Sequence, residues 1–274
     1  MSKIISIGVV LSLLVFMPAC KGSTTPAPPA VTVTSITVTS ASTMLKVGQT
    51  ETFTATCNMS NGTQKAATGT WSSSAGTVAQ VNASGLVTIV GAGNANIVMT
   101  ESGKTGSKGI RGVPDYQGTW GVGTYRFDSC SNTGDWATMD FCGEVPVGTL
   151  APITLTMTQT TDIVNCNVLL GQLTFTAASS TIATNGQLTL VGAITYSTTS
   201  INVTIVLQQA TPGQLTGTLV QVWTDTTLLG YCQFNCSISS LSRTNPSPNE
   251  AAVMGSPLPK NATLQDIIRV IIRR

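Results

Sequence analysis

Short stretches in which apolar and polar residues alternate run through most of this chain, and they limit its fold more than any other feature. Two clear cases are 153–158, where Ile, Leu and Met alternate with Thr, and 201–208, where Ile, Val and Leu occupy every second position. Successive side chains of a β-strand point to opposite faces, so a period of two predicts strands with one buried face. Thr, Ser, Val, Ile and Gly dominate, and helix-forming residues are sparse. We therefore predict an all-β protein.

The first nineteen residues predict export. Lys3 supplies a positive charge, and 4–16 form an apolar run of thirteen residues. A membrane-spanning helix needs about 20, so this run is typical of a signal peptide. Ala19 and Cys20 then resemble the end of a bacterial lipoprotein signal, which implies that Cys20 is diacylated and becomes the mature N-terminus. A plain secretory signal cut nearby is the alternative, and both export the protein.

The composition argues against several classes of function. Only 9% of residues are charged and the formal net charge is +2, which does not favour nucleic acid binding. The sequence has no histidine, which excludes Ser-His-Asp and Cys-His catalysis and histidine metal sites. Asp135 and Asp140 are the only close pair of carboxylates in a candidate site, and nothing near them prepares a raised pKa or a cleft. We predict a protein that is not an enzyme and has no catalytic residue, metal or cofactor.

Pro-rich segments and a change of pattern divide the chain. The predicted parts are a signal peptide (1–19), a lipid-anchored linker (20–31), a β-sandwich (32–113), an antiparallel β-barrel (116–243), a Pro-rich linker (244–263) and a C-terminal amphipathic segment (264–274).

The block 32–113 resembles the bacterial Ig-like domain of group 2. The matching strings are ITVTS (36–40), LKVGQTETFTAT (45–56) and TWSSSAGTVAQVNASGLVTIVGAGNANI (70–97). The resemblance implies a β-sandwich that serves as a stalk or display module in adhesins and other surface proteins, with no catalytic residues. We expect Trp71 to fill the core of this sandwich and Cys57 to be a small buried hydrophobe.

From 116 to 243 the strands are longer and the turns tighter. We expect strands at 118–127, 152–159, 163–169, 172–177, 187–196, 201–208, 214–223 and 228–238. Eight successive strands with short turns predict a meander that closes into a barrel, with a second sandwich as the alternative. The opening Gly118-Thr119-Trp120 resembles the first strand of lipocalins, which implies that Trp120 plugs the barrel floor and Arg243 packs across it.

Export makes disulfides the default interpretation of the cysteines. The sequence has seven cysteines. Cys20 is the predicted lipidation site, and the candidates for disulfide bonds lie in the second domain: Cys130, Cys142, Cys166, Cys232 and Cys236. We favour Cys130–Cys142, which bracket a loop after the first barrel strand. Cys130–Cys232 competes, because the last strand of a closed meander lies beside the first. Cys232 and Cys236 stand four residues apart on one strand, about 13 Å, and are too distant to bond each other.

The stretch 128–144, DSCSNTGDWATMDFCGE, gathers acidic and aromatic residues that are scarce elsewhere. They are Asp128, Asp135, Trp136, Asp140, Phe141 and Glu144. One hypothesis is a cap over a barrel mouth that buries the aromatic rings, and another is a loop that contacts a ligand or glycan. Calcium binding is a weaker hypothesis, because the spacing fits no EF-hand.

In the C-terminal segment, apolar residues at 264, 267, 268 and 271 follow a helical period. It could dock onto its own barrel, add a strand, or contact a partner or membrane surface through Arg269, Arg273 and Arg274.

Together these features predict an exported, lipid-anchored surface protein of the bacterial envelope, anchored in the outer membrane and facing the periplasm or the exterior. The Ig-like domain would be a spacer, and the barrel would be a binding or adhesion module for a cell-surface protein or glycan. The alternative is a lipocalin-like carrier of a small apolar ligand. Gly192 and Gly217 on the expected inner face would leave room for such a ligand, whereas the large residues around them favour a filled interior.

Overall fold

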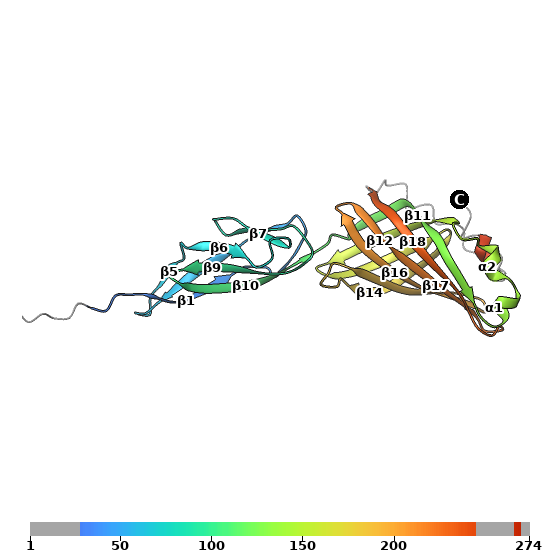
Figure 1. Cartoon of the computed structure of the whole chain (residues 1–274), viewed down its shortest axis with the longest axis horizontal. Coiled ribbons are helices and arrows are strands. Elements are labelled where there is room, and N and C mark those ends of the chain that lie inside the picture. Colours follow the sequence, from blue (N-terminus) through green and yellow to red (C-terminus); the bar gives the residue numbers. More distant parts are fainter. Residues whose placement is uncertain (1–27, 245–265, 270–274) are drawn as a thin grey trace, which may run out of the picture.

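The computed structural model describes residues 28–244 and 266–269. Two β domains lie end to end along the long axis of the molecule (Figure 1). The predicted signal peptide, Cys20 and nearly all of the second linker lie outside the described residues. Within them, no helix is both long enough and apolar enough to span a bilayer.

The first domain is a sandwich of short strands. Its strands are β1 (Val33–Thr39), β2 (Met44–Lys46), β3 (Thr50–Thr52), β4 (Thr54–Met59), β5 (Gln64–Ala66), β6 (Thr70–Ser73), β7 (Ala79–Val81), β8 (Leu86–Ile89), β9 (Gly93–Glu101) and β10 (Lys104–Val113). They pair as β1-β4-β5, β2-β10-β9-β6 and β3-β8-β7. Their apolar faces enclose one core, in which Phe53 and the free Cys57 are fully buried.

The expectation that Trp71 fills this core is only partly right. Trp71 is half-buried and packs against the core from β6, an edge strand of its sheet. Its ring covers the turn at Gly85, where φ is +82° and an added Cβ would lie 3.1 Å from the ring. Phe53 takes the central place instead.

The second domain is one antiparallel sheet curled into a barrel. Its strands are β11 (Gly118–Asn132), β12 (Leu150–Thr160), β13 (Ile163–Leu170), β14 (Leu173–Thr181), β15 (Leu188–Tyr196), β16 (Thr199–Thr211), β17 (Gln214–Asp225) and β18 (Cys232–Thr244). The order is β14-β13-β12-β11-β18-β17-β16-β15, so first and last strands pair directly. The predicted fold class, an all-β chain with an Ig-like sandwich and a barrel, is confirmed.

The barrel closes at a seam between β14 and β15. These strands lie side by side, yet no ladder of hydrogen bonds joins them within the described ranges. Phe175 of β14 bridges the seam instead, because its ring occupies the place where a side chain at Gly192 of β15 would stand, 2.4 Å from an added Cβ.

Most strand boundaries differ from the prediction by one to six residues, and two of the larger differences, at the end of β11 and at the start of β18, concern β11–β18 pairing. β11 continues to Asn132, which pairs with Cys232, so Cys130 belongs to a strand rather than to the start of a loop. β18 starts at Cys232 instead of residue 228. Of the predicted loop 128–144, the first five residues are therefore strand, and the rest contains the helical turns α1 (Asp135–Thr138) and α2 (Phe141–Glu144).

The barrel interior is filled by side chains. Leu188, Leu190, Leu215, Leu219 and Trp223 all lie in one buried cluster. An added Cβ at Gly217 would lie 2.1 Å from the carbonyl oxygen of Val206, so this glycine leaves no free space either. The described interior therefore offers no room at the two glycines on which the carrier hypothesis depended.

Ion pairs hold the two domains together at their junction. Arg111 of β10 pairs with Asp162 of the barrel at 2.8 Å. Asp115 accepts hydrogen bonds from Lys46 of the first domain at 2.8 Å and from Arg243 of the second at 2.9 Å. The side chains involved are partly shielded from solvent, so each pair holds better than an exposed one.

We predict that 32–113 and 116–243 fold independently, because each part has its own buried core. Separately expressed fragments should each unfold in one cooperative transition, measured by calorimetry. The second fragment should start at 114, since Asp115 pairs with Arg243. A barrel fragment that is soluble only when fused to the first domain would contradict this division.

Candidate functional site

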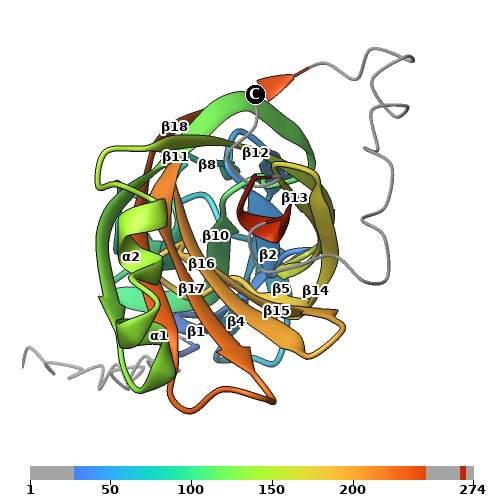
Figure 2. The ribbon, with the colours of Figure 1, turned by 90° about the vertical axis from the view of Figure 1, so that its right-hand side faces the viewer.

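The end of the barrel farthest from the Ig-like domain carries the features that sequence analysis singled out. We call residues 133–149, which include α1 and α2, the distal cap. Figures 1 and 2 place both helical turns at this end, beside the mouth of the barrel. A further helical turn, 266–269, lies at the same mouth, and its Ile267 and Ile268 join the buried cluster of the barrel. This turn is the described part of the C-terminal segment, for which docking onto its own barrel is one of the predicted arrangements. Residues 264, 271, 273 and 274 lie outside the described part.

Backbone contacts join the distal cap to the loop before β18. The amide of Asp135 donates to the carbonyl of Leu229 at 3.0 Å, and the carboxylate of Asp135 accepts from the Leu229 amide at 2.8 Å. Gly134 and Gly230 both have positive φ, and an added Cβ at either would lie 2.3 Å from a carbonyl oxygen of the opposite loop. Glycine is therefore required at both positions for the two backbones to approach so closely.

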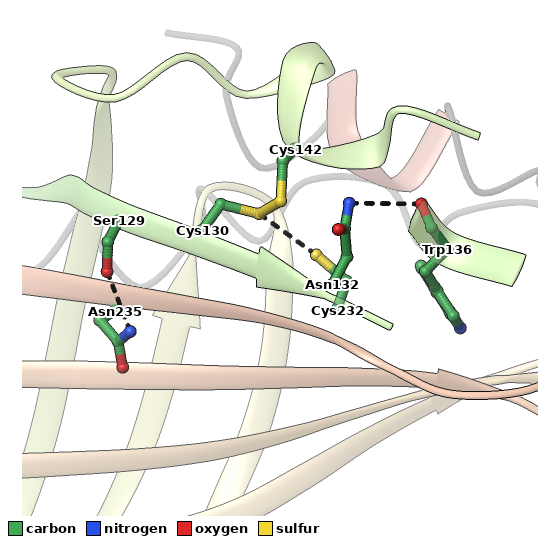
Figure 3. Close-up of a disulfide and its surroundings, with 7 residues drawn as sticks. All are labelled: Ser129, Cys130, Asn132, Trp136, Cys142, Cys232 and Asn235. Atoms are coloured by element: carbon green, nitrogen blue, oxygen red, sulfur yellow. Dashed lines mark hydrogen bonds between the residues drawn. A yellow bond between two sulfur atoms is a disulfide. The ribbon is translucent and has the colours of Figure 1, made fainter. Parts of the chain in front are cut away.

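A disulfide provides a second attachment. Cys130 of β11 is bonded to Cys142 of α2, with the Cα atoms 5.6 Å apart. Figure 3 shows Cys232 of β18 beside this bond, with its sulfur 3.5 Å from the sulfur of Cys130. Cys166 and Cys236 are buried free thiols. Burial raises the pKa of Cys166, Cys232 and Cys236 to about 12, so these thiols are protonated at neutral pH.

The aromatic residues of the cap point inward. Trp136 is 0% exposed and meets Phe141 edge to face, with the ring centroids 4.9 Å apart. Phe141 in turn contacts Trp223 at 5.4 Å and Phe234 at 6.0 Å. The rings therefore continue the barrel core outward through the cap. This is the geometry of the cap hypothesis, and it removes Trp136 from direct contact with a ligand.

The acidic residues do not converge on one point. Asp128 pairs with Arg126 on the same strand at 2.7 Å, and the carboxylate of Asp135 is used by the Leu229 amide. Asp140 precedes α2 with φ of +50°, and Glu144 is exposed. Among described residues, the one group whose ligand atoms are close enough for a metal is Cys130, Cys142 and Cys232. The geometry therefore gives no support to the calcium hypothesis or to a catalytic carboxylate pair.

A polar residue that the sequence-based predictions did not include lies inside the barrel. Gln221 is fully buried, donates to the hydroxyl of Tyr125 at 3.3 Å and accepts from the indole nitrogen of Trp223 at 3.1 Å. Its position in the alternation, between Leu219 and Trp223, is the signal that could have revealed it. Because both partners are satisfied, Gln221 fixes the aromatic rings rather than offering a free polar group.

Exposed apolar side chains also occur at this end of the barrel, in the cap itself, at the start of β12 and in the loop before β18. Half of the large hydrophobic residues that are exposed in the described chain lie at this end, and we call them the distal apolar surface: Met139, Val147, Leu150, Leu229 and Tyr231. Leu229 is 77% exposed and Val147 is 68% exposed. Clustered exposed apolar residues are typical of contact surfaces, whereas single ones are common everywhere.

At the opposite end, next to the Ig-like domain, Trp120 is fully buried and its indole donates to the carbonyl of Tyr116 at 2.8 Å. The guanidinium of Arg243 lies 4.6 Å from the centre of the Trp120 ring. The two residues named from the lipocalin resemblance thus lie against each other. A cation over an aromatic face is attractive in its own right, so the contact does not by itself indicate a lipocalin.

Comparison with known proteins concerns mainly the first domain. Residues 32–110 match the family described as bacterial Ig-like domain (group 2). The first domain is a bacterial Ig-like domain. No curated protein matches the chain. One similar solved structure is that of domains 5–6 of the S-layer protein SbsC, with 16% identity, 75% of this chain and 98% of that chain covered, and a TM-score of 0.27. A score of that size does not indicate a shared overall fold. The description of the second domain as a barrel therefore depends on its strand pairing alone.

Proposed function

We propose that this protein is a non-enzymatic component of the bacterial cell surface, in which the Ig-like domain spaces a barrel head away from a lipid anchor. The bacterial Ig-like domain supports a surface role. The main observation behind the proposal is the order of the two domains along the long axis. The described chain starts at one end of this axis, and the end of the barrel that carries the distal apolar surface lies at the other (Figure 1). The head therefore presents this surface to a protein or glycan on a neighbouring surface.

Lipid anchoring is tested at Cys20. We predict that Cys20→Ala moves the protein from the membrane fraction to the soluble fraction, because the acylated cysteine is the anchor that we propose. Immunoblots of fractionated cells, washed with high salt, measure the change. A mutant that stays in the salt-washed membranes would contradict this anchor and point to the C-terminal segment.

Binding through the head is tested on the distal apolar surface. The double variant Met139→Asp and Leu229→Asp places charge on two exposed positions, and we expect it to lower binding of the labelled protein to intact host cells at least tenfold. Both positions are exposed, so stability should hardly change. Val191→Asp is the matched control, since Val191 is 51% exposed on β15, outside the distal apolar surface. Equal loss of binding in variant and control would contradict recognition through the distal end.

A further inference from the structure

Three sulfur atoms meet where the distal cap joins the barrel. Cys130, Cys142 and Cys232 place their sulfurs within 4.8 Å of one another, although they come from β11, α2 and β18 (Figure 3). Two of them form the disulfide, and the third is a free thiol. We propose that this is a thiol–disulfide exchange site, in which the bond moves between Cys130–Cys142 and Cys130–Cys232 and thereby releases or locks the distal cap.

The exchange needs no external oxidant. The Cys232 thiol is buried and protonated in the described structure, so a local opening must first let it lose its proton to solvent, and the thiolate then attacks the sulfur of Cys130. A Cys130–Cys232 bond forms as the Cys130–Cys142 bond breaks, and the electron pair leaves with the sulfur of Cys142, which takes up a proton. One disulfide and one thiol are present before and after, so there is no net oxidation or reduction.

The fold positions attacker and target together. Asn132 pairs with Cys232 and Cys130 pairs with Phe234, so the two cysteines are diagonal neighbours on adjacent strands of a continuous ladder. Their sulfurs are already 3.5 Å apart. In an attack in line with the breaking bond, the sulfurs of Cys232, Cys130 and Cys142 lie on one line. The sulfur of Cys232 would then be about 5.5 Å from that of Cys142, because the 3.5 Å separation adds to a disulfide bond of about 2.05 Å. The sulfurs form a more compact triangle, so a side-chain rotation must precede each exchange.

The two pairings have different consequences for the cap. Cys130–Cys142 attaches α2 to β11, and the neighbouring Phe141 is thereby held in the aromatic stack. Cys130–Cys232 instead joins two strands that already pair, so it adds nothing to the attachment of α2. Exchange therefore loosens the cap and frees the half-buried Cys142, whose sulfur can then react with a thiol reagent from solution.

Peptide mapping tests the exchange on the exported full chain, extracted in mild detergent. Cleavage before aspartate separates the three cysteines, because Cys130 falls in 128–134, Cys142 in 140–161, and Cys232 together with Cys236 in 225–265. The protein is equilibrated with reduced and oxidised glutathione, quenched with acid, alkylated and digested. We expect wild type to give peptide 128–134 linked to 140–161 and also to 225–265. Recovery of 140–161 as the sole linked partner of 128–134 would overturn the proposal.

Two variants keep the test decisive whatever fraction of the wild-type protein carries the Cys130–Cys142 bond and whatever fraction carries the Cys130–Cys232 bond. In Cys142→Ser, peptide 128–134 should be almost fully linked to 225–265, whereas an alkylated, unlinked Cys130 would overturn the proposal. Cys236→Ser is the matched control that separates the two cysteines of 225–265, and it should leave every linkage of the wild type in place. Loss of the 225–265 linkage in Cys236→Ser would assign it to Cys236 and contradict the exchange. The result does not depend on what the distal apolar surface binds.

Discussion

Trp136→Ala is expected to lower the free energy of unfolding of the barrel by about 3–5 kcal/mol, as large truncations in a core do. Trp136 is fully buried and holds Phe141 in the aromatic stack, so its loss opens a cavity between cap and barrel. The melting temperature of the barrel should fall by on the order of 10 °C. Calorimetry of the intact chain measures this, because the transition of the Ig-like domain serves as an internal reference.

Two further variants show whether the effect belongs to the buried ring. Met139→Ala alters a residue of the same cap that is 45% exposed, and it should change stability by less than about 0.5 kcal/mol. Trp136→Phe keeps an aromatic ring and removes an indole nitrogen that has no hydrogen-bond partner among the described residues, so it should cost less than Trp136→Ala. A thermal unfolding curve of Trp136→Ala that matches that of wild type would contradict the cap interpretation and favour a ligand-contacting role for this residue.

Gly217→Ala is expected to destabilise the barrel by about 2–3 kcal/mol, the upper part of the usual range for overpacking. The added Cβ would lie 2.1 Å from the carbonyl oxygen of Val206, and this backbone atom cannot move without disturbing the β16–β17 ladder. Urea unfolding of the barrel measures the change.

Gly121→Ala is the matched control for Gly217→Ala. Gly121 also lies in a barrel strand, but the nearest atoms to an added Cβ belong to the side chain of Thr154 at 3.6 Å, an ordinary contact. Its effect should stay within about 0.5 kcal/mol. A lipocalin-like carrier with an internal cavity would tolerate both changes equally, so equal stability of the two variants would revive that hypothesis. Native mass spectrometry of protein from its own host would then reveal a bound small molecule.

Much of the architecture could be predicted because it depends on patterns among residues that are close together in the sequence. The period of two along each barrel strand depends only on neighbours in the sequence, and the matching strings of the Ig-like domain lie within one continuous block. The pairing of first and last strands followed from closure of a meander, which is a topological argument. The same argument predicts that Cys232 lies near Cys130, and their sulfurs are 3.5 Å apart.

Other features depend on contacts between distant segments, and no local pattern reveals these. Residues 128–132 are polar and resemble a loop, yet β18 extends the ladder along them and makes them strand. Trp71 is only half-buried because β6 lies at a sheet edge. Gln221 is tolerated inside the barrel because Tyr125 and Trp223, from different positions along the chain, satisfy its amide.

By itself, therefore, the sequence determined that this chain forms two β domains, one of them Ig-like, and that acidic and aromatic residues gather in 128–144, before the second barrel strand. Only the tertiary structure decided that the barrel is filled at Gly192 and Gly217, and that the aromatic residues of the cap face inward. The physical reason is that the alternation states which face of a strand is buried, whereas register and bulges decide which atoms stand opposite one another. Whether a glycine opens a cavity or makes room for a neighbouring ring depends on those opposing atoms.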